Sequence, residues 1–304
     1  MKVIHPITIT DAMLISSGIA EPDTGETAWS GATTYALNDE VYLASTHRMY
    51  RSVQGSNLNH NPATDDGTWW LTLGGTNRWA MFDDYVSTAS TKAASPLAVT
   101  IAPGLCDGLF LYGLIGTSAN ITITDGAGGP EVYNTDLDLM TPSITTWYDY
   151  YFGAFRQVPY FVLTDLPPYV NARITLTVTG DSSVACGMMA PGRIYTIGQT
   201  LYSPKVGIRD YSRKVVDADT GFTTLTQGRF AKTLRAEVRL FSTTFAEVHS
   251  TLESLRATPC VWIGDSDGDG AIEPLTVYGF YRDFSLMIDL PSGGVYSLAT
   301  ERPA

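Results

Sequence analysis

The chain carries little charge for its length, and most of that charge is acidic. Only 16% of its 304 residues are Asp, Glu, Lys or Arg, and 19 basic residues against 31 acidic ones give a net charge of −12. A surface that binds nucleic acid needs a basic stripe to neutralise phosphates. We therefore expect no nucleic-acid partner.

Cysteines and long apolar runs are also scarce. The three cysteines, Cys106, Cys186 and Cys260, are odd in number and far apart, which predicts no disulfide framework and favours a reducing compartment. No run approaches the roughly 18 apolar residues that cross a bilayer, and the first residues lack the apolar segment of a signal peptide. We expect a soluble chain that is not exported by a signal peptide and does not insert into membranes.

Patterns typical of catalysis are missing as well. The four histidines are scattered without the spacing of a metal site, and most acidic residues lie in turns, where Asp is expected for backbone reasons. No nucleophile and base, and no pair of carboxylates, stand out. The sequence predicts a protein that is not an enzyme.

The residues that are abundant predict a mainly β protein with four regions. A short strand and a turn-rich linker occupy residues 1–27, and a small aromatic β module occupies residues 28–75. A β-sandwich or jelly roll follows at 76–191, and a β-sandwich with one flanking helix at 192–304.

The module at 28–75 is built around aromatic residues separated by turns. Its pattern is made by Ala28, Trp29, Tyr35, the turn at 37–39, Val41, Tyr42, Tyr50, Arg51, Pro62 and Trp69. On these residues the module resembles carbohydrate-binding modules of the family 5/12 type, found beside chitinases and in phage tail proteins. It implies a small sheet that can display rings to a glycan.

Aromatic rings suit sugars because the C–H faces of pyranoses stack on them. We take Tyr50, Trp69 and Trp70, which lie beside a polar loop, as the candidate carbohydrate-binding residues. The alternative is that these rings form the core of the module, as we expect for Trp29 and Tyr42.

The region 76–191 shows strand patterns at 97–101, 108–115, 120–124, 160–163 and 173–179. In the last of these, Ile174, Leu176 and Val178 alternate with threonines, which predicts one buried face. The pattern is loosely similar to that of galactose-binding-like jelly rolls. Residues 147–155 are dense in rings and form either an exposed binding surface or part of the core.

The last region combines strands at 205–210, 231–241, 260–263, 275–284 and 295–300 with a helix at 244–256. Thr244 and Glu247 predict a capping box at the start of that helix. Phe245, Val248, Leu252 and Leu255 form its apolar stripe, with His249 on the polar side.

The order of these elements is similar to that of the ring-forming tube and distal-tail proteins of long-tailed bacteriophages. The segments that carry the resemblance are 231–238, 245–256 and 275–279. It implies a structural component of a tail tip or baseplate, assembled in the host cytoplasm and located in the virion. The implied partners are further copies in a ring, tail tube, tape-measure and hub proteins, and host-surface glycan.

Two other functions stay open on the sequence alone. One is a freestanding lectin-like protein, and the other is an accessory of glycan hydrolysis, which the lack of an acid/base pair disfavours.

An acidic run at 265–273 spaces its carboxylates like a calcium loop. Asp265, Asp267 and Asp269 occupy positions 1, 3 and 5, but Thr276 stands where such a loop has its bidentate Glu. The run is either a solvated hairpin connection or a Ca²⁺ site held by these three residues.

Overall fold

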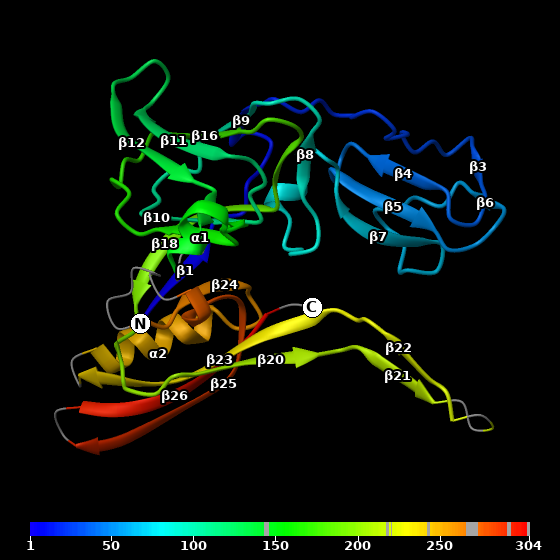
Figure 1. Cartoon of the computed structure of the whole chain (residues 1–304). Helices are drawn as coiled ribbons and strands as arrows, with labels where there is room; N and C mark the ends of the chain where they lie inside the picture. The colour runs from blue at the N-terminus through cyan, green and yellow to red at the C-terminus, as the bar shows by residue number, and fades with distance from the viewer. Residues whose placement is uncertain are drawn as a thin grey trace. The chain divides into compact units, whose positions relative to one another are not determined.

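The computed structural model describes residues 1–142, 146–216, 219, 221–241, 244–265, 273–290 and 293–302. The chain is mainly β, with antiparallel sheets and, among the described residues, two α-helices (Figure 1). This confirms the predicted fold class. None of the described helices is long and apolar enough to cross a membrane.

The chain divides into two compact units, which we describe separately. Unit 1 comprises Met1–Pro6, Val162–Asp165 and Gly192–Ala304, and unit 2 comprises Ile7–Phe161 and Leu166–Pro191.

The first eleven strands are β1 (Lys2–Pro6), β2 (Leu14–Ser17), β3 (Thr34–Tyr35), β4 (Glu40–Leu43), β5 (Arg48–Ser52), β6 (Asn57–Leu58), β7 (Trp70–Gly75), β8 (Ser90–Lys92), β9 (Leu97–Ile101), β10 (Gly108–Tyr112) and β11 (Ser118–Asp125). The next eight are β12 (Glu131–Asp138), β13 (Met140–Pro142), β14 (Phe155–Gln157), β15 (Tyr160–Leu163), β16 (Ala172–Thr179), β17 (Val184–Cys186), β18 (Met188–Thr196) and β19 (Gln199–Thr200). The last seven are β20 (Lys205–Asp210), β21 (Arg213–Val216), β22 (Thr223–Thr226), β23 (Phe230–Phe241), β24 (Cys260–Ile263), β25 (Thr276–Leu290) and β26 (Gly293–Glu301). The helices are α1 (Trp147–Phe152), α2 (Phe245–Ser254) and the short 3-10 turns η1 (Ala80–Phe82) and η3 (Glu273–Leu275).

The largest sheet of unit 2 has the order β12-β11-β16-β9-β2. Along β16, Ile174, Leu176 and Val178 are buried, as the alternating sequence predicts, because successive side chains of a strand point to opposite faces. On the other face, Thr100 and Thr175 are hydrogen-bonded across the strands at 2.9 Å. The buried face holds this layer together.

The aromatic module contributes a second, smaller sheet to unit 2, with the order β4-β5-β7, beside the two-stranded pair β3-β6. Its core consists of Tyr35, Val41, Tyr50 and Trp70. The Tyr35 and Trp70 rings meet edge to face at 5.2 Å. So few buried side chains make a marginal core, and the module depends on the rest of unit 2 for stability.

In unit 1, α2 packs on one face of a sheet in which β24, β25, β26 and β23 are neighbours (Figure 1). Val248, Leu252 and Leu255 are buried against it, which confirms the predicted apolar stripe. The predicted capping box does not form, because Thr244 is not extended (φ −108°, ψ 1°) and its hydroxyl donates to the Phe241 carbonyl. The side chain of His249 is half-exposed, 3.4 Å from Glu253.

The ring-dense segment contains a helix that the sequence analysis did not predict. α1 begins at a capping box in which Thr146 and Asp149 satisfy each other's backbone N–H groups, and none of its residues is buried. Asp149 stands where Glu or Gln is more usual in this motif, three residues after the cap.

Candidate functional site

The most unusual surface of unit 1 is the antiparallel hairpin of β21 and β22, which we call the arm. The arm follows from β20 and leads back into β23, two strands that pair from Lys205↔Arg235 to Asp210↔Phe230 (Figure 1). All eight residues of its two strands are exposed. A two-stranded hairpin is at best marginally stable in water without a third strand or a packed face.

The exposed residues of the arm include large apolar side chains. Val216 and Leu225 lie on the same face, because the register pairs Val216 with Thr223 and Lys214 with Leu225. Both are more than half exposed. Apolar side chains held on an exposed two-stranded ribbon are typical of a surface that a partner covers.

A buried carboxylate fixes the base of the arm. Glu301, only 8% exposed, accepts hydrogen bonds from Arg282 at 2.6 Å, Tyr211 at 3.0 Å and Arg209 at 3.1 Å. Burial raises the pKa of Glu301, but the Tyr211 and Arg282 hydrogen bonds and the two guanidinium charges outweigh burial and leave the pKa below its usual 4.5. Arg209 and Tyr211 flank the end of β20, so this cluster ties the arm to β25 and β26.

Beside this cluster, unit 1 has an open groove of about 860 Å³. Arg235 and Glu237 line the groove and alternate along β23 with residues that pack against α2. The groove therefore lies on the sheet face opposite that helix. Arg282 and Asp283 contribute further charges of both signs, so its walls suit a polar partner.

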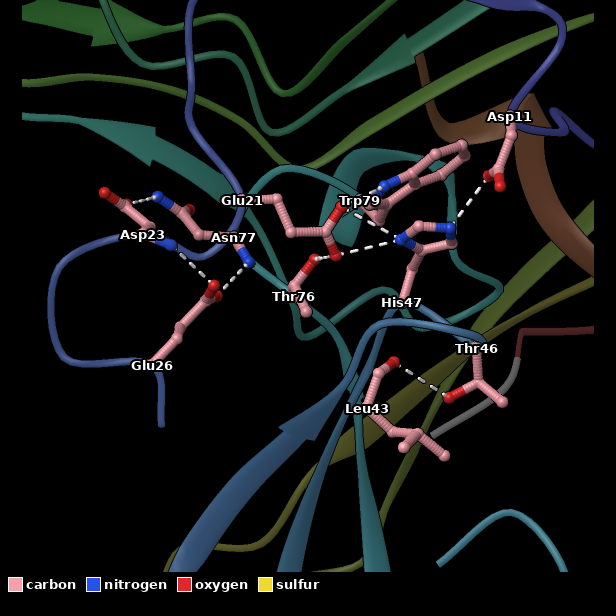
Figure 2. A network of polar contacts seen from close by, with 10 residues as sticks. All are labelled: Asp11, Glu21, Asp23, Glu26, Leu43, Thr46, His47, Thr76, Asn77 and Trp79. Atoms are coloured by element: carbon pink, nitrogen blue, oxygen red, sulfur yellow. Dashed lines mark hydrogen bonds and ion pairs between the residues drawn. The ribbon is translucent and has the colours of Figure 1, made fainter. Parts of the chain in front are cut away.

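In unit 2 the most connected polar cluster joins the linker to the end of the aromatic module. Figure 2 shows Glu21 facing His47, Thr76 and Trp79. Its carboxylate accepts from Thr76 Oγ1 at 2.8 Å and from Trp79 Nε1 at 2.9 Å, and both of its oxygens lie 2.9 Å from His47 Nδ1. The other ring nitrogen of His47 lies 2.8 Å from Asp11.

The geometry gives this cluster a structural role. The His47 and Trp79 rings are stacked, with centroids 4.4 Å apart, and each nitrogen of His47 faces a carboxylate. A general base needs a nitrogen within hydrogen-bond reach of a substrate proton. Here both nitrogens already face a carboxylate of the protein. Because Glu21 belongs to the linker, the contacts hold the linker against the module.

A second set of contacts extends the same junction (Figure 2). Glu26 accepts from the backbone N–H groups of Asp23 at 2.8 Å and of Asn77 at 2.7 Å, and the Asn77 amide donates to Asp23. Nearby, burial raises the pKa of Asp83 although Gly75, Thr88 and Tyr85 donate hydrogen bonds to it.

The three predicted carbohydrate-binding residues differ in exposure. Tyr50 and Trp70 are buried in the module core, and Trp70 Nε1 donates to the His60 carbonyl at 2.8 Å. Trp69 is partly exposed and stacks on His60 with centroids 3.9 Å apart. A sugar can reach only a ring that is open to solvent, so carbohydrate binding stays a prediction that depends on Trp69.

Of the predicted calcium ligands, Asp267 and Asp269 lie outside the described residues. Asp265 lies just beyond β24 and is buried, and its carbonyl accepts from Thr200 Oγ1 at 3.4 Å. The part of the chain that the structure describes holds no group of three His, Cys, Asp or Glu side chains placed for a metal ion. Calcium binding stays a prediction.

Comparisons with known proteins identify no relative of the chain. It matches no protein-family model, and neither a curated protein nor a solved structure matches it.

Sequence reasoning missed both the arm and the junction. Two strands of four exposed residues, with five of the eight residues polar, give no periodic signal strong enough to place β21 and β22. Glu21 and His47 are 26 residues apart. Nothing in their spacing indicates contact.

Proposed function

We propose that the chain is a structural subunit of a bacteriophage tail tip or baseplate that assembles with further copies of itself around the tail axis. In this proposal the arm of each subunit packs on a neighbouring copy. The aromatic module and the adjoining sheet of unit 2 lie on the outside of the assembly.

The observation that supports the proposal best is the exposed arm. Unit 1 fixes its base through Glu301, Arg209 and Arg282, yet leaves Val216 and Leu225 in solvent. A hydrogen-bonded base with an uncovered apolar face favours a permanent partner over a free loop, because covering the apolar side chains with another surface stabilises the assembly.

The order of elements in unit 1 adds support. A twelve-residue strand β23, the helix α2 on one sheet face and the returning strands β25 and β26 form the arrangement on which the resemblance to tube and distal-tail proteins rests. Host-glycan contact is a further part of the proposal, and it depends on Trp69. The lectin-like alternative is less well supported, because Tyr50 and Trp70 are buried.

Light scattering on the purified full chain tests the proposal, with electron microscopy of any large species. The expected result is rings or oligomers that the double variant Val216→Ser/Leu225→Ser converts to smaller species. Ile15→Ser is the matched control, since it replaces an exposed apolar residue of unit 2 by the same residue type. A chain whose association is equally strong in the arm variant and the control would refute the role of the arm.

A further inference from the structure

A second uncovered surface lies in unit 2, on α1 and the first residue of β14. Its six rings, which we call the ring patch, are Trp147, Tyr148, Tyr150, Tyr151, Phe152 and Phe155. Their exposed fractions run from 61% for Tyr150 to 81% for Trp147. No residue of α1 is buried, so the chain itself does not use these rings for its core.

The five rings on α1 form one continuous surface. Between ring centroids, Trp147 lies 6.3 Å from Tyr150, Tyr150 lies 5.1 Å from Tyr151, Tyr151 lies 6.4 Å from Phe152, and Tyr148 lies 5.0 Å from Phe152. Because successive helix positions are about 100° apart, the five rings on α1 cover an arc of about 200°. The helix therefore presents a convex aromatic surface with Asp149 on its far side.

The size of the ring patch matches one side of a stable protein interface. A Phe, Tyr or Trp side chain buries about 150–250 Å². Six rings with the exposures above therefore offer roughly 600–1,000 Å². A standard interface takes about 800 Å² from each partner.

The chemistry of the patch favours a protein partner over a sugar or a bilayer. Interface cores are rich in Tyr, Trp and Phe and poor in charged residues. A sugar site needs several polar side chains beside the rings, and the Asp149 carboxylate is used by the backbone and hydroxyl of Thr146. Binding to an anionic membrane needs a basic cluster, and residues 146–157 hold one cation, Arg156, in a chain of net charge −12.

Among protein partners, a second copy of the chain fits the patch best. The net charge of −12 makes two copies repel each other. Residues 146–157 carry one acidic and one basic side chain, so this repulsion is absent where two ring patches meet. An aromatic surface is also its own complement, since ring edges pack on ring faces. A twofold contact uses the same patch twice.

We propose that the ring patch on α1 is a self-association surface, through which two copies of this chain pair about a twofold axis. This contact is separate from the arm and does not depend on the tail-tip proposal. Trp147, Tyr148 and Tyr151 lie in the middle of the arc and form the centre of the contact.

Sedimentation velocity over a range of concentrations tests this contact. The experiment uses the full chain carrying Val216→Ser/Leu225→Ser, so that association through the arm does not obscure it. We expect a monomer–dimer equilibrium that Trp147→Ala/Tyr148→Ala/Tyr151→Ala weakens at least about 100-fold in Kd, as for the loss of three central aromatic contacts. The control Tyr85→Ala/Tyr169→Ala removes two exposed rings elsewhere in unit 2 and leaves the dimer unchanged.

Acrylamide quenching gives an independent measurement on the unmodified patch. Trp147 is the most exposed tryptophan of the chain, so dimerisation shields it and quenching falls as protein concentration rises. The same titration with Trp147→Phe shows no such fall. A strict monomer, or a dimer that the triple variant leaves intact, would overturn the proposal. Flotation with phosphatidylcholine vesicles that depends on the rings, without dimerisation, would also overturn it and assign the patch to a bilayer.

Discussion

Removing the Glu21 carboxylate tests the physical account of the junction in unit 2. The side chain is 10% exposed and has three partners: Thr76, Trp79 and His47. Glu21→Ala leaves the Trp79 N–H and the His47 nitrogen without their acceptor. Breaking a buried charged contact of this kind costs about 3–5 kcal/mol.

Two further variants turn this value into a graded series. Glu21→Gln keeps an oxygen that accepts from Trp79 and an amide that donates to the Thr76 hydroxyl, so only the charged contact with His47 weakens and the cost is about 1–2 kcal/mol. Asp11→Ala removes the other carboxylate that faces His47. The Asp11 side chain is 74% exposed. An exposed pair is worth about 0–1 kcal/mol.

Calorimetry of thermal unfolding measures all three effects on the transition of unit 2. For a unit of this size, each kcal/mol lowers Tm by about 2–4 °C, so Glu21→Ala is expected to lower it by roughly 6–20 °C. Asp11→Ala should change Tm by less than about 4 °C. Equal effects of Glu21→Ala and Asp11→Ala would refute the argument that burial makes the difference between the two carboxylates.

Three other predictions concern single sites. Because the folded pKa of Glu301 is lowered, its contribution to stability is complete above its usual pKa of 4.5 and is lost as pH falls through the folded value. The unfolding free energies of unit 1 in the wild type and in Glu301→Gln, measured between about pH 6 and 3, should therefore converge in acid. A difference that stays constant with pH contradicts this. Trp70→Ala should cost about 3–5 kcal/mol in denaturant unfolding of the module, whereas Trp69→Ala should leave the module folded and reduce any glycan binding on an array; unfolding by both variants would remove the case for a separate sugar-binding role. Burial raises the pKa of the Cys186 and Cys260 thiols to about 12, so a thiol reagent at pH 8 should modify both only after unfolding, and fast modification of the native chain would show that these sites open.

Strands with strong periodicity were predictable from the sequence. The strand predicted at 97–101 and that at 260–263 match β9 and β24 to the residue. The alternation of Ile174, Leu176 and Val178 identified the buried face of β16, because burial on one side imposes a period of two.

Local signals were less reliable at helix starts. The box predicted at Thr244 and Glu247 is absent, while one forms at Thr146 and Asp149, in the segment expected to be either an exposed binding surface or part of the core. Tyr, Phe and Trp are enriched in strands, yet a cap starts a helix through them here, and sequence alone does not show which Thr adopts the extended backbone.

The candidate sites depended mostly on tertiary placement. The aromatic composition of residues 28–75 predicted rings in the module, but it did not show that Tyr50 and Trp70 turn inward while Trp69 stacks on His60. The contact between Glu21 and His47 arises from the path of the linker. Such contacts between distant residues leave no pattern in one sequence.

Electron cryomicroscopy of the full chain tests most directly the central claim that copies assemble through the arm. The account predicts closed rings in which Val216 and Leu225 of each copy are covered by its neighbour. Rings in which both side chains remain in solvent, or single copies at every concentration, would contradict it.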